Sequence, residues 1–129
     1  MPLDGSVFLE PNSNPEVQVA LRQLKAARQL ISRRRNWTRG ALQRKKLFSS
    51  GYRYCAVGAM MQVGANRLAY SVLSCTLNEY GPYLPSVIET FNDRFSHAKV
   101  VRLFDDAIHN LATADIDSLI WYMTATASD

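Results

Sequence analysis

The sequence predicts a mainly α protein, a compact single-domain helical bundle. The prediction also allows for a short strand or an extended carboxyl-terminal segment in addition to the helices. Apolar residues recur at helical spacing in residues 14–32 and again in residues 96–111. Residues 55–63 are small or apolar with one polar exception, which is typical of a segment at the centre of a domain. The length of 129 residues suits one domain, and the hydrophobic fraction of 47% is that of a globular chain.

The first helix is predicted from the way it begins. Residues 1–13 contain Pro2, Gly5 and Pro11, so they are expected to form an irregular arm ahead of a single domain at residues 14–129. Asn14 is a good N-cap, and the proline after it fits the first helical position. One face of the helix is apolar, through Val17, Leu21, Leu24 and Ile31.

The segment after this helix breaks the helical pattern with four arginines. Thr38 is expected to cap a short helix over residues 41–48, which a turn at Ser49-Ser50-Gly51 ends. Residues 55–63 are expected to be helical, with Gly58 and Ala59 small enough for another helix to approach closely. A further helix is predicted over residues 67–80.

The carboxyl-terminal part contains one clear helix and two open segments. Ser96 is expected to cap an amphipathic helix over residues 96–111. Residues 86–94 fit either a short helix or an extended connection. Residues 115–124 fit either a final helix or a strand, because a continuous apolar run does not distinguish the two.

Three short segments carry a resemblance to a known family: Asn36-Trp37-Thr38-Arg39-Gly40, Tyr54-Cys55-Ala56-Val57-Gly58-Ala59 and Phe91-Asn92-Asp93. Their order resembles the Trp-x-x-Gly, Cys-Ala-x-Gly-Ala and Asn-Asp motifs of a family of small uncharacterised bacterial and phage proteins. The resemblance implies a small helical fold and a bacterial or phage origin, and it implies no activity. From their position, Asn92 and Asp93 are expected to bond their own backbone or to cap the following helix.

Positive charge is concentrated in the first part of the chain. Residues 1–53 hold eleven Lys/Arg and three acids, a net charge of +8, whereas residues 54–129 hold four bases and eight acids, a net charge of −4. The isoelectric point near 9.3 favours an anionic partner. Attraction between the two oppositely charged parts, within the fold or between copies, is the other interpretation.

The same composition predicts a cytoplasmic protein without a membrane partner. No apolar run approaches the roughly 18–20 residues that a membrane span needs. The amino terminus lacks the basic and apolar regions of a secretory signal. Two cysteines, Cys55 and Cys75, are too few for a disulfide scaffold, so a reducing compartment is expected.

The strongest functional candidate is a basic segment after the first helix. Guanidinium groups pair with phosphates, and an exposed tryptophan stacks on bases. We therefore predict a non-enzymatic binding protein that contacts nucleic acid or another phosphate-rich ligand through Arg33, Arg34, Arg35, Trp37, Arg39, Arg44, Lys45 and Lys46. Trp37 has a second interpretation, as an anchor that holds a turn in the core. The alternative function is a protein–protein interaction module, either a homo-oligomer or a phage or bacterial effector of a host protein.

Catalytic and metal-binding interpretations rank lower, and the sequence predicts no cofactor. Cys55 at a helix start after Arg53 has the setting that lowers a thiol pKa, so a cysteine hydrolase using His97 or His109 is a distant third hypothesis. Packing in the core is the favoured role for Cys55. Asp105 and His109 share a helix face at metal-ligand spacing, but the predicted role is a solvated ion pair. Phosphate-loop, dinucleotide and Gly-x-Ser-x-Gly motifs are absent from the sequence.

Overall fold

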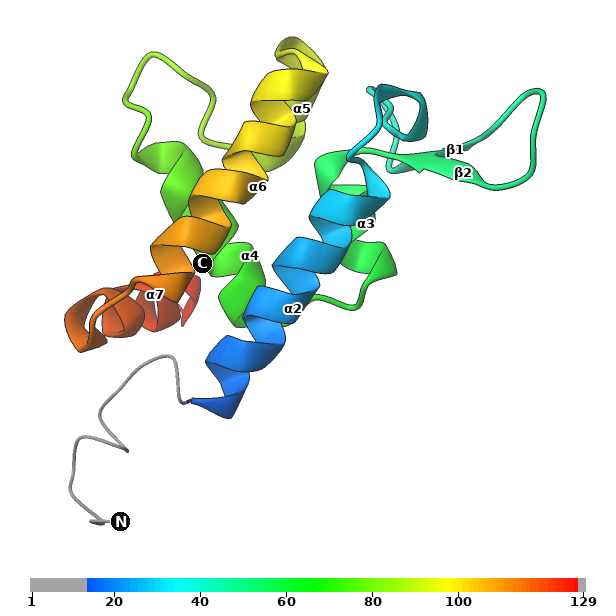
Figure 1. Cartoon of the computed structure of the whole chain (residues 1–129). Helices are drawn as coiled ribbons and strands as arrows, with labels where there is room; N and C mark the ends of the chain where they lie inside the picture. Colours follow the sequence, from blue (N-terminus) through cyan, green and yellow to red (C-terminus); the bar gives the residue numbers. More distant parts are fainter. Residues whose placement is uncertain (1–13, 128–129) are drawn as a thin grey trace.

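A computed structural model describes residues 14–127 as a mainly α fold with one short hairpin, which confirms the predicted fold class (Figure 1). The predicted arm at residues 1–13 lies outside the described residues. The elements in chain order are α2 (Pro15–Leu30), the 3-10 turn η2 (Arg34–Asn36), β1 (Gln43–Lys45), β2 (Tyr52–Tyr54), α3 (Ala56–Gln62), α4 (Arg67–Asn78), α5 (Ile88–Arg94), α6 (His97–Ala112) and α7 (Ile116–Ala127).

The core lies where α4 packs against α2, α6 and α7, and where α2 packs against α6. Leu24 of α2, Leu73 of α4 and Phe104 of α6 are all fully buried in it. The helices predicted at residues 14–32 and 96–111 are confirmed as α2 and α6. Residues 55–63, which we expect at the centre of the domain, contribute Ala56, Ala59 and Met60 to this core, but the segment lies to one side of it. The seven-residue α3 contacts α2 and α5 at one end of the body, and its Met61 is 56% exposed.

The hairpin is the main departure from the sequence prediction. Residues 41–48 do not form the expected helix, because Gln43–Lys45 pairs antiparallel with Tyr52–Tyr54. Gly51 has φ +100, a left-handed conformation that reverses the chain between the two strands. The pairing extends beyond the strands, with Lys46 N donating to Gly51 O at 3.1 Å. Tertiary pairing therefore overrides the helix propensity of this Gln-Arg-Lys-Lys segment.

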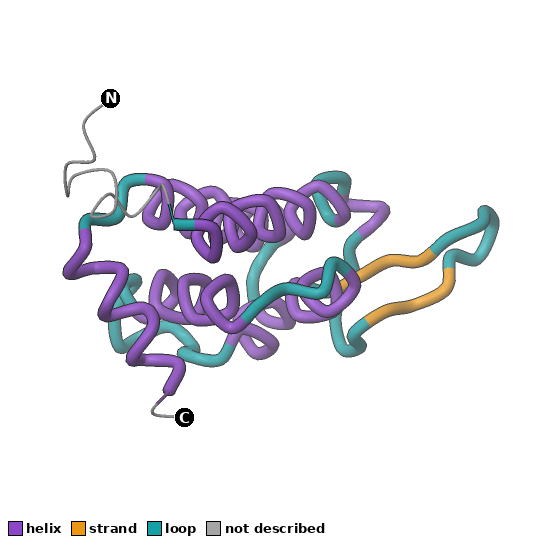
Figure 2. Tube along the Cα trace, turned by 90° about the horizontal axis from the view of Figure 1, so that it is seen from below, coloured by secondary structure: helices purple, strands orange, loops and turns teal. Residues whose placement is uncertain are grey.

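The hairpin projects from the helical body, and Gly58 of α3 fixes its base (Figure 2). A Cβ added at Gly58 would lie 1.8 Å from the carbonyl oxygen of Leu42. That carbonyl also accepts a hydrogen bond from Cys55 N at 3.1 Å. The predicted close approach at Gly58 is therefore real, but the approaching element is the hairpin backbone and not a helix.

Both open segments are helical. Residues 86–94 contain α5, and residues 115–124 lie largely in α7, whose first turn is capped by Asp115 accepting from Ser118 N at 2.8 Å. The α7 helix buries Leu119 and Tyr122 and exposes three apolar side chains. None of the helices in the described part of the chain combines the length and the apolar composition that a membrane span requires.

Candidate functional site

The turn between α2 and β1 presents three arginines to solvent. The buried stripe of α2 ends at Ile31, and the next buried side chain is that of Trp37. Arg33, Arg34 and Arg35 lie between these two anchors, and all three are exposed. Two apolar anchors with only polar residues between them thus push the arginines outward.

The hairpin adds a second set of cations. Arg44 lies directly opposite Arg53 in the strand register, so their side chains share one face of the hairpin. Lys46, two residues beyond Arg44, falls on the same face by strand alternation. Lys45 lies opposite Tyr52 on the other face. Like charges directly opposite one another destabilise a strand pair, and a bound anion would remove that cost.

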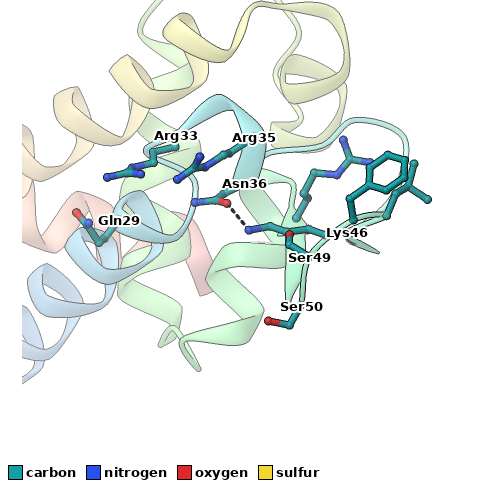
Figure 3. A pocket seen from close by; sticks show the side chains of 10 residues that line it. Gln29, Arg33, Arg35, Asn36, Lys46, Ser49 and Ser50 are labelled. Atoms are coloured by element: carbon teal, nitrogen blue, oxygen red, sulfur yellow. Dashed lines mark hydrogen bonds between the residues drawn. The ribbon is translucent and has the colours of Figure 1, made fainter.

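The turn between α2 and β1, here called the arginine turn, and the hairpin border an open basic groove of about 840 Å³ (Figure 3). Lys46 reaches across it and donates from Nζ to Asn36 Oδ1 at 2.7 Å, which ties the hairpin to the turn. The groove contains four cations and no carboxylate among the described residues. Its lining is Gln29, Arg33, Arg35, Asn36, Lys46, Leu47, Phe48, Ser49, Ser50 and Arg53.

Neither of the ion pairs found among the described residues involves a cation of this groove. Asp105 of α6 pairs with Arg28 at 2.5 Å, and Asp106 pairs with Arg102 at 3.9 Å. Nε of Arg53, a residue that lines the groove, is itself buried and has no hydrogen-bond partner in the described structure. A buried donor without a partner costs free energy, so this guanidinium carries a local cost in the described structure.

The structure brings three of the eight predicted binding residues into the groove: Arg33, Arg35 and Lys46. Arg34, Arg44 and Lys45 are exposed on the same two segments but do not line it. Arg34 and Arg44 add positive charge to the turn and to the groove-side face of the hairpin, whereas Lys45 lies on the other face of the hairpin.

Trp37 and Arg39 have structural roles instead. Trp37 is 7% exposed and donates from Nε1 to Asn92 Oδ1 at 2.7 Å, so its ring does not face a ligand. The guanidinium of Arg39 lies 4.9 Å from the centre of that ring and donates to the carbonyl of Phe95. Of the two sequence interpretations of Trp37, the structure supports the core anchor.

Arg53 is the groove residue that the sequence analysis missed. Its position in the groove depends on the strand pairing of Arg53 with Arg44. The predicted helix over residues 41–48 excluded such a pairing. The sequence does contain a signal for this strand. In Tyr52-Arg53-Tyr54, aromatic and charged residues alternate directly after the turn residues Ser49-Ser50-Gly51, and such alternation after a turn is typical of a strand.

Asn92 is the centre of a second, buried polar cluster. Its Oδ1 accepts from Trp37 Nε1 and from Ala56 N at 3.0 Å, and its Nδ2 donates to Thr38 O at 3.0 Å and to Asp93 Oδ1 at 3.2 Å. All four hydrogen-bonding positions of the amide are therefore used. Asp93 in turn accepts from Gly40 N at 2.9 Å. The expected local role for Asn92 and Asp93 is wrong, since they connect α5 to the arginine turn and to α3.

Cys55 caps α3 with its sulfur, which accepts from Gly58 N at 3.2 Å. It is 3% exposed and borders a small cavity of about 200 Å³ that also contains Glu89 and Asp93. Burial raises the pKa of the Cys55 thiol, and the two carboxylates raise it further, against the opposing backbone N–H groups of Gly58 and Val57. This environment disfavours a thiolate nucleophile.

We therefore expect Cys55 to resist alkylation in the native protein. A thiol with a raised pKa stays neutral at pH 7–8, and the thiolate is the reactive form. Iodoacetamide labelling followed by mass spectrometry of the Cys55 peptide should show slow modification in buffer and fast modification in denaturant. Rapid native labelling at neutral pH would contradict this assignment.

The described residues contain no cluster of three or more His, Cys, Asp and Glu side chains suited to a metal ion. Asp105 of the predicted Asp105–His109 pair bonds Arg28 across to α2. His97 bonds the carbonyl of Ile31 at 2.5 Å and packs its ring against Trp37. His97 therefore holds the arginine turn against α6.

These features define a small helical protein with a basic groove at the base of a projecting hairpin. A family model of unknown function, DUF6197, matches residues 15–110, and the chain belongs to this family. This agrees with the expected uncharacterised family. No curated protein and no solved structure matches the chain.

Proposed function

We propose that this protein is a non-enzymatic nucleic-acid-binding protein whose basic groove holds the phosphate backbone. One observation carries the proposal: Arg33, Arg35, Lys46 and Arg53, from two separate segments, line one groove without a carboxylate among the described residues. Arginine clusters suit phosphates, since the planar guanidinium forms paired hydrogen bonds with their oxygens.

A polymer fits this surface better than a single phosphate does. Three further exposed cations, Arg34, Arg44 and Lys45, lie on the same turn and hairpin outside the groove. An extended backbone reaches several of these charges at once and releases a counterion at each contact. From the sequence we also propose a bacterial or phage origin and a cytoplasmic location.

A protein–protein interaction module is the second candidate. The outer face of α7 favours it, because Ile116, Ile120 and Trp121 are 43%, 54% and 62% exposed there. The arginine groove is not explained by this candidate. Failure of the native chain to bind any nucleic acid at low salt would leave the α7 face as the better-supported surface.

The test is a groove variant with Arg33, Arg35 and Arg53 replaced by Gln. We expect its affinity for oligonucleotides at low salt to fall more than about tenfold, because three phosphate contacts are lost. The plot of log affinity against log salt should flatten by about 2–3, at roughly 0.7–0.9 per contact. Fluorescence anisotropy over a salt series measures both quantities.

The matched control replaces Arg94, Lys99 and Arg102 by Gln. This control removes the same charge from exposed positions that do not line the groove. We expect its affinity and salt slope to stay close to those of the native protein. Equal losses in the two triple variants would show that net charge alone drives binding and would refute the groove.

A further inference from the structure

The tip of the hairpin carries two exposed apolar side chains beside the groove. Leu47 is 84% exposed and Phe48 is 100% exposed, and both line the groove together with the cations. Single exposed apolar residues are ordinary on protein surfaces. A fully exposed phenyl ring at the mouth of a cationic groove is a more specific arrangement, because it combines a flat apolar surface with a site for phosphates.

The hairpin fixes the backbone on both sides of Phe48 and leaves its ring uncovered. Lys45 pairs with Tyr52, and the hydrogen bond from Lys46 N to Gly51 O closes the ladder just before the tip. Ser49 and Ser50, which follow Phe48, are small and exposed. The backbone is therefore fixed on both sides of the tip, and the ring stays open to a ligand.

We infer that Phe48 is a stacking platform for an unpaired base, so that the ligand of the groove is single-stranded nucleic acid. The inference rests on the proposed function, since the groove must first hold the backbone. A cationic groove next to an exposed aromatic ring is the usual arrangement for binding single strands, with phosphates in the groove and bases on the ring.

The exposed ring favours a single strand over a duplex. The cations and Phe48 line the same open groove between the turn and the hairpin. A single strand offers unpaired bases to the ring while its phosphates contact the cations, whereas a duplex keeps its bases stacked inside. The charge also favours nucleic acid over an apolar protein segment, because four cations line the same groove as the ring, with no carboxylate among its described lining residues.

The experiment compares Phe48→Ala with the native chain on two probes of equal length, an oligothymidylate and an abasic oligomer with the same phosphates. We expect Phe48→Ala to weaken oligothymidylate binding by about tenfold per stacked base. Binding of the abasic oligomer and the salt slope on both probes should stay unchanged. Phe48→Trp, which restores an aromatic face, should bind oligothymidylate at least as tightly as the native chain.

Tyr83→Ala is the matched control. Tyr83 is 98% exposed in the loop between α4 and α5 and does not line the groove, so its loss should change neither probe's affinity. Native-like oligothymidylate binding by Phe48→Ala would overturn the stacking platform while leaving the groove intact. Equal losses on both probes, or a larger loss on a duplex of the same sequence, would also overturn it. Absence of binding by the native chain to either oligomer, with binding to the duplex, would overturn the single-strand inference; absence of binding to the duplex as well would refute the proposed function itself.

Discussion

Replacement of Asn92 by alanine is expected to lower the free energy of unfolding by about 3–4 kcal/mol. Asn92 is fully buried, and the truncation leaves Trp37 Nε1, Ala56 N and Thr38 O without their partner. Each buried polar group left unpaired costs about 1–3 kcal/mol. Chemical denaturation followed by circular dichroism measures the difference.

Two further variants identify the cause of the loss. Asn78→Ala alters an exposed asparagine at the end of α4 and should change stability by less than about 0.5 kcal/mol. Asn92→Asp keeps the oxygen that accepts from Trp37 and Ala56, but it places an acceptor against the carbonyl of Thr38 and a second carboxylate beside Asp93. It should therefore also destabilise the fold. An Asn92→Ala protein with native stability would show that these hydrogen bonds contribute little.

The Asn92 cluster joins the three segments on which the family resemblance was based. Trp37 and Gly40 come from the first segment, Ala56 from the second, and Asn92 and Asp93 from the third. The sequence alone suggested local backbone bonds or a helix cap for Asn92 and Asp93, and a core anchor as one of two roles for Trp37. Their actual partners are 36 to 55 residues away along the chain, so no local spacing identifies them.

The helices were predictable because their signals are local. Asn14 caps α2 by accepting from Glu16 N, and Ser96 caps α6 by accepting from Lys99 N. The buried residues of α2 and α6 follow the helical period seen in the sequence. The hairpin was not predicted, because β1 consists of three exposed polar residues without apolar alternation.

The positive charge of the candidate site could be predicted from the sequence, but which of its residues lie together could not. The run of arginines after α2 identifies a basic surface from composition alone. Which cations face each other depends on the register that sets Arg44 opposite Arg53, and this depends in turn on the contact between α3 and the hairpin. Trp37 shows the same limit, since its exposure is decided by the distant Asn92.

Gly58→Ala is expected to destabilise the protein by about 2–4 kcal/mol, although helix propensity alone predicts the opposite sign. Alanine in a helix interior is favoured over glycine by about 1 kcal/mol. At this position, however, the added methyl group would lie 1.8 Å from Leu42 O and 2.7 Å from Leu42 C. Backbone atoms of a paired segment cannot move aside as a flexible side chain does.

Relief of this clash requires the hairpin to move away from α3. That movement breaks the hydrogen bond from Cys55 N to Leu42 O and displaces Lys46 and Arg53 from the groove wall. The Gly58→Ala variant should therefore lose oligonucleotide affinity as well as stability. Gly64→Ala is the control that distinguishes a steric clash from backbone strain. Gly64 has φ +67, which strains an alanine, but the space around its Cβ position is open, so no clash arises. The Gly64→Ala variant should lose about 1 kcal/mol of stability and keep its binding.

A Gly58→Ala protein that is more stable than the native chain and binds oligonucleotides equally well would contradict this prediction. That result would show that the base of the hairpin is free to move and that the groove does not depend on the contact between the hairpin and α3.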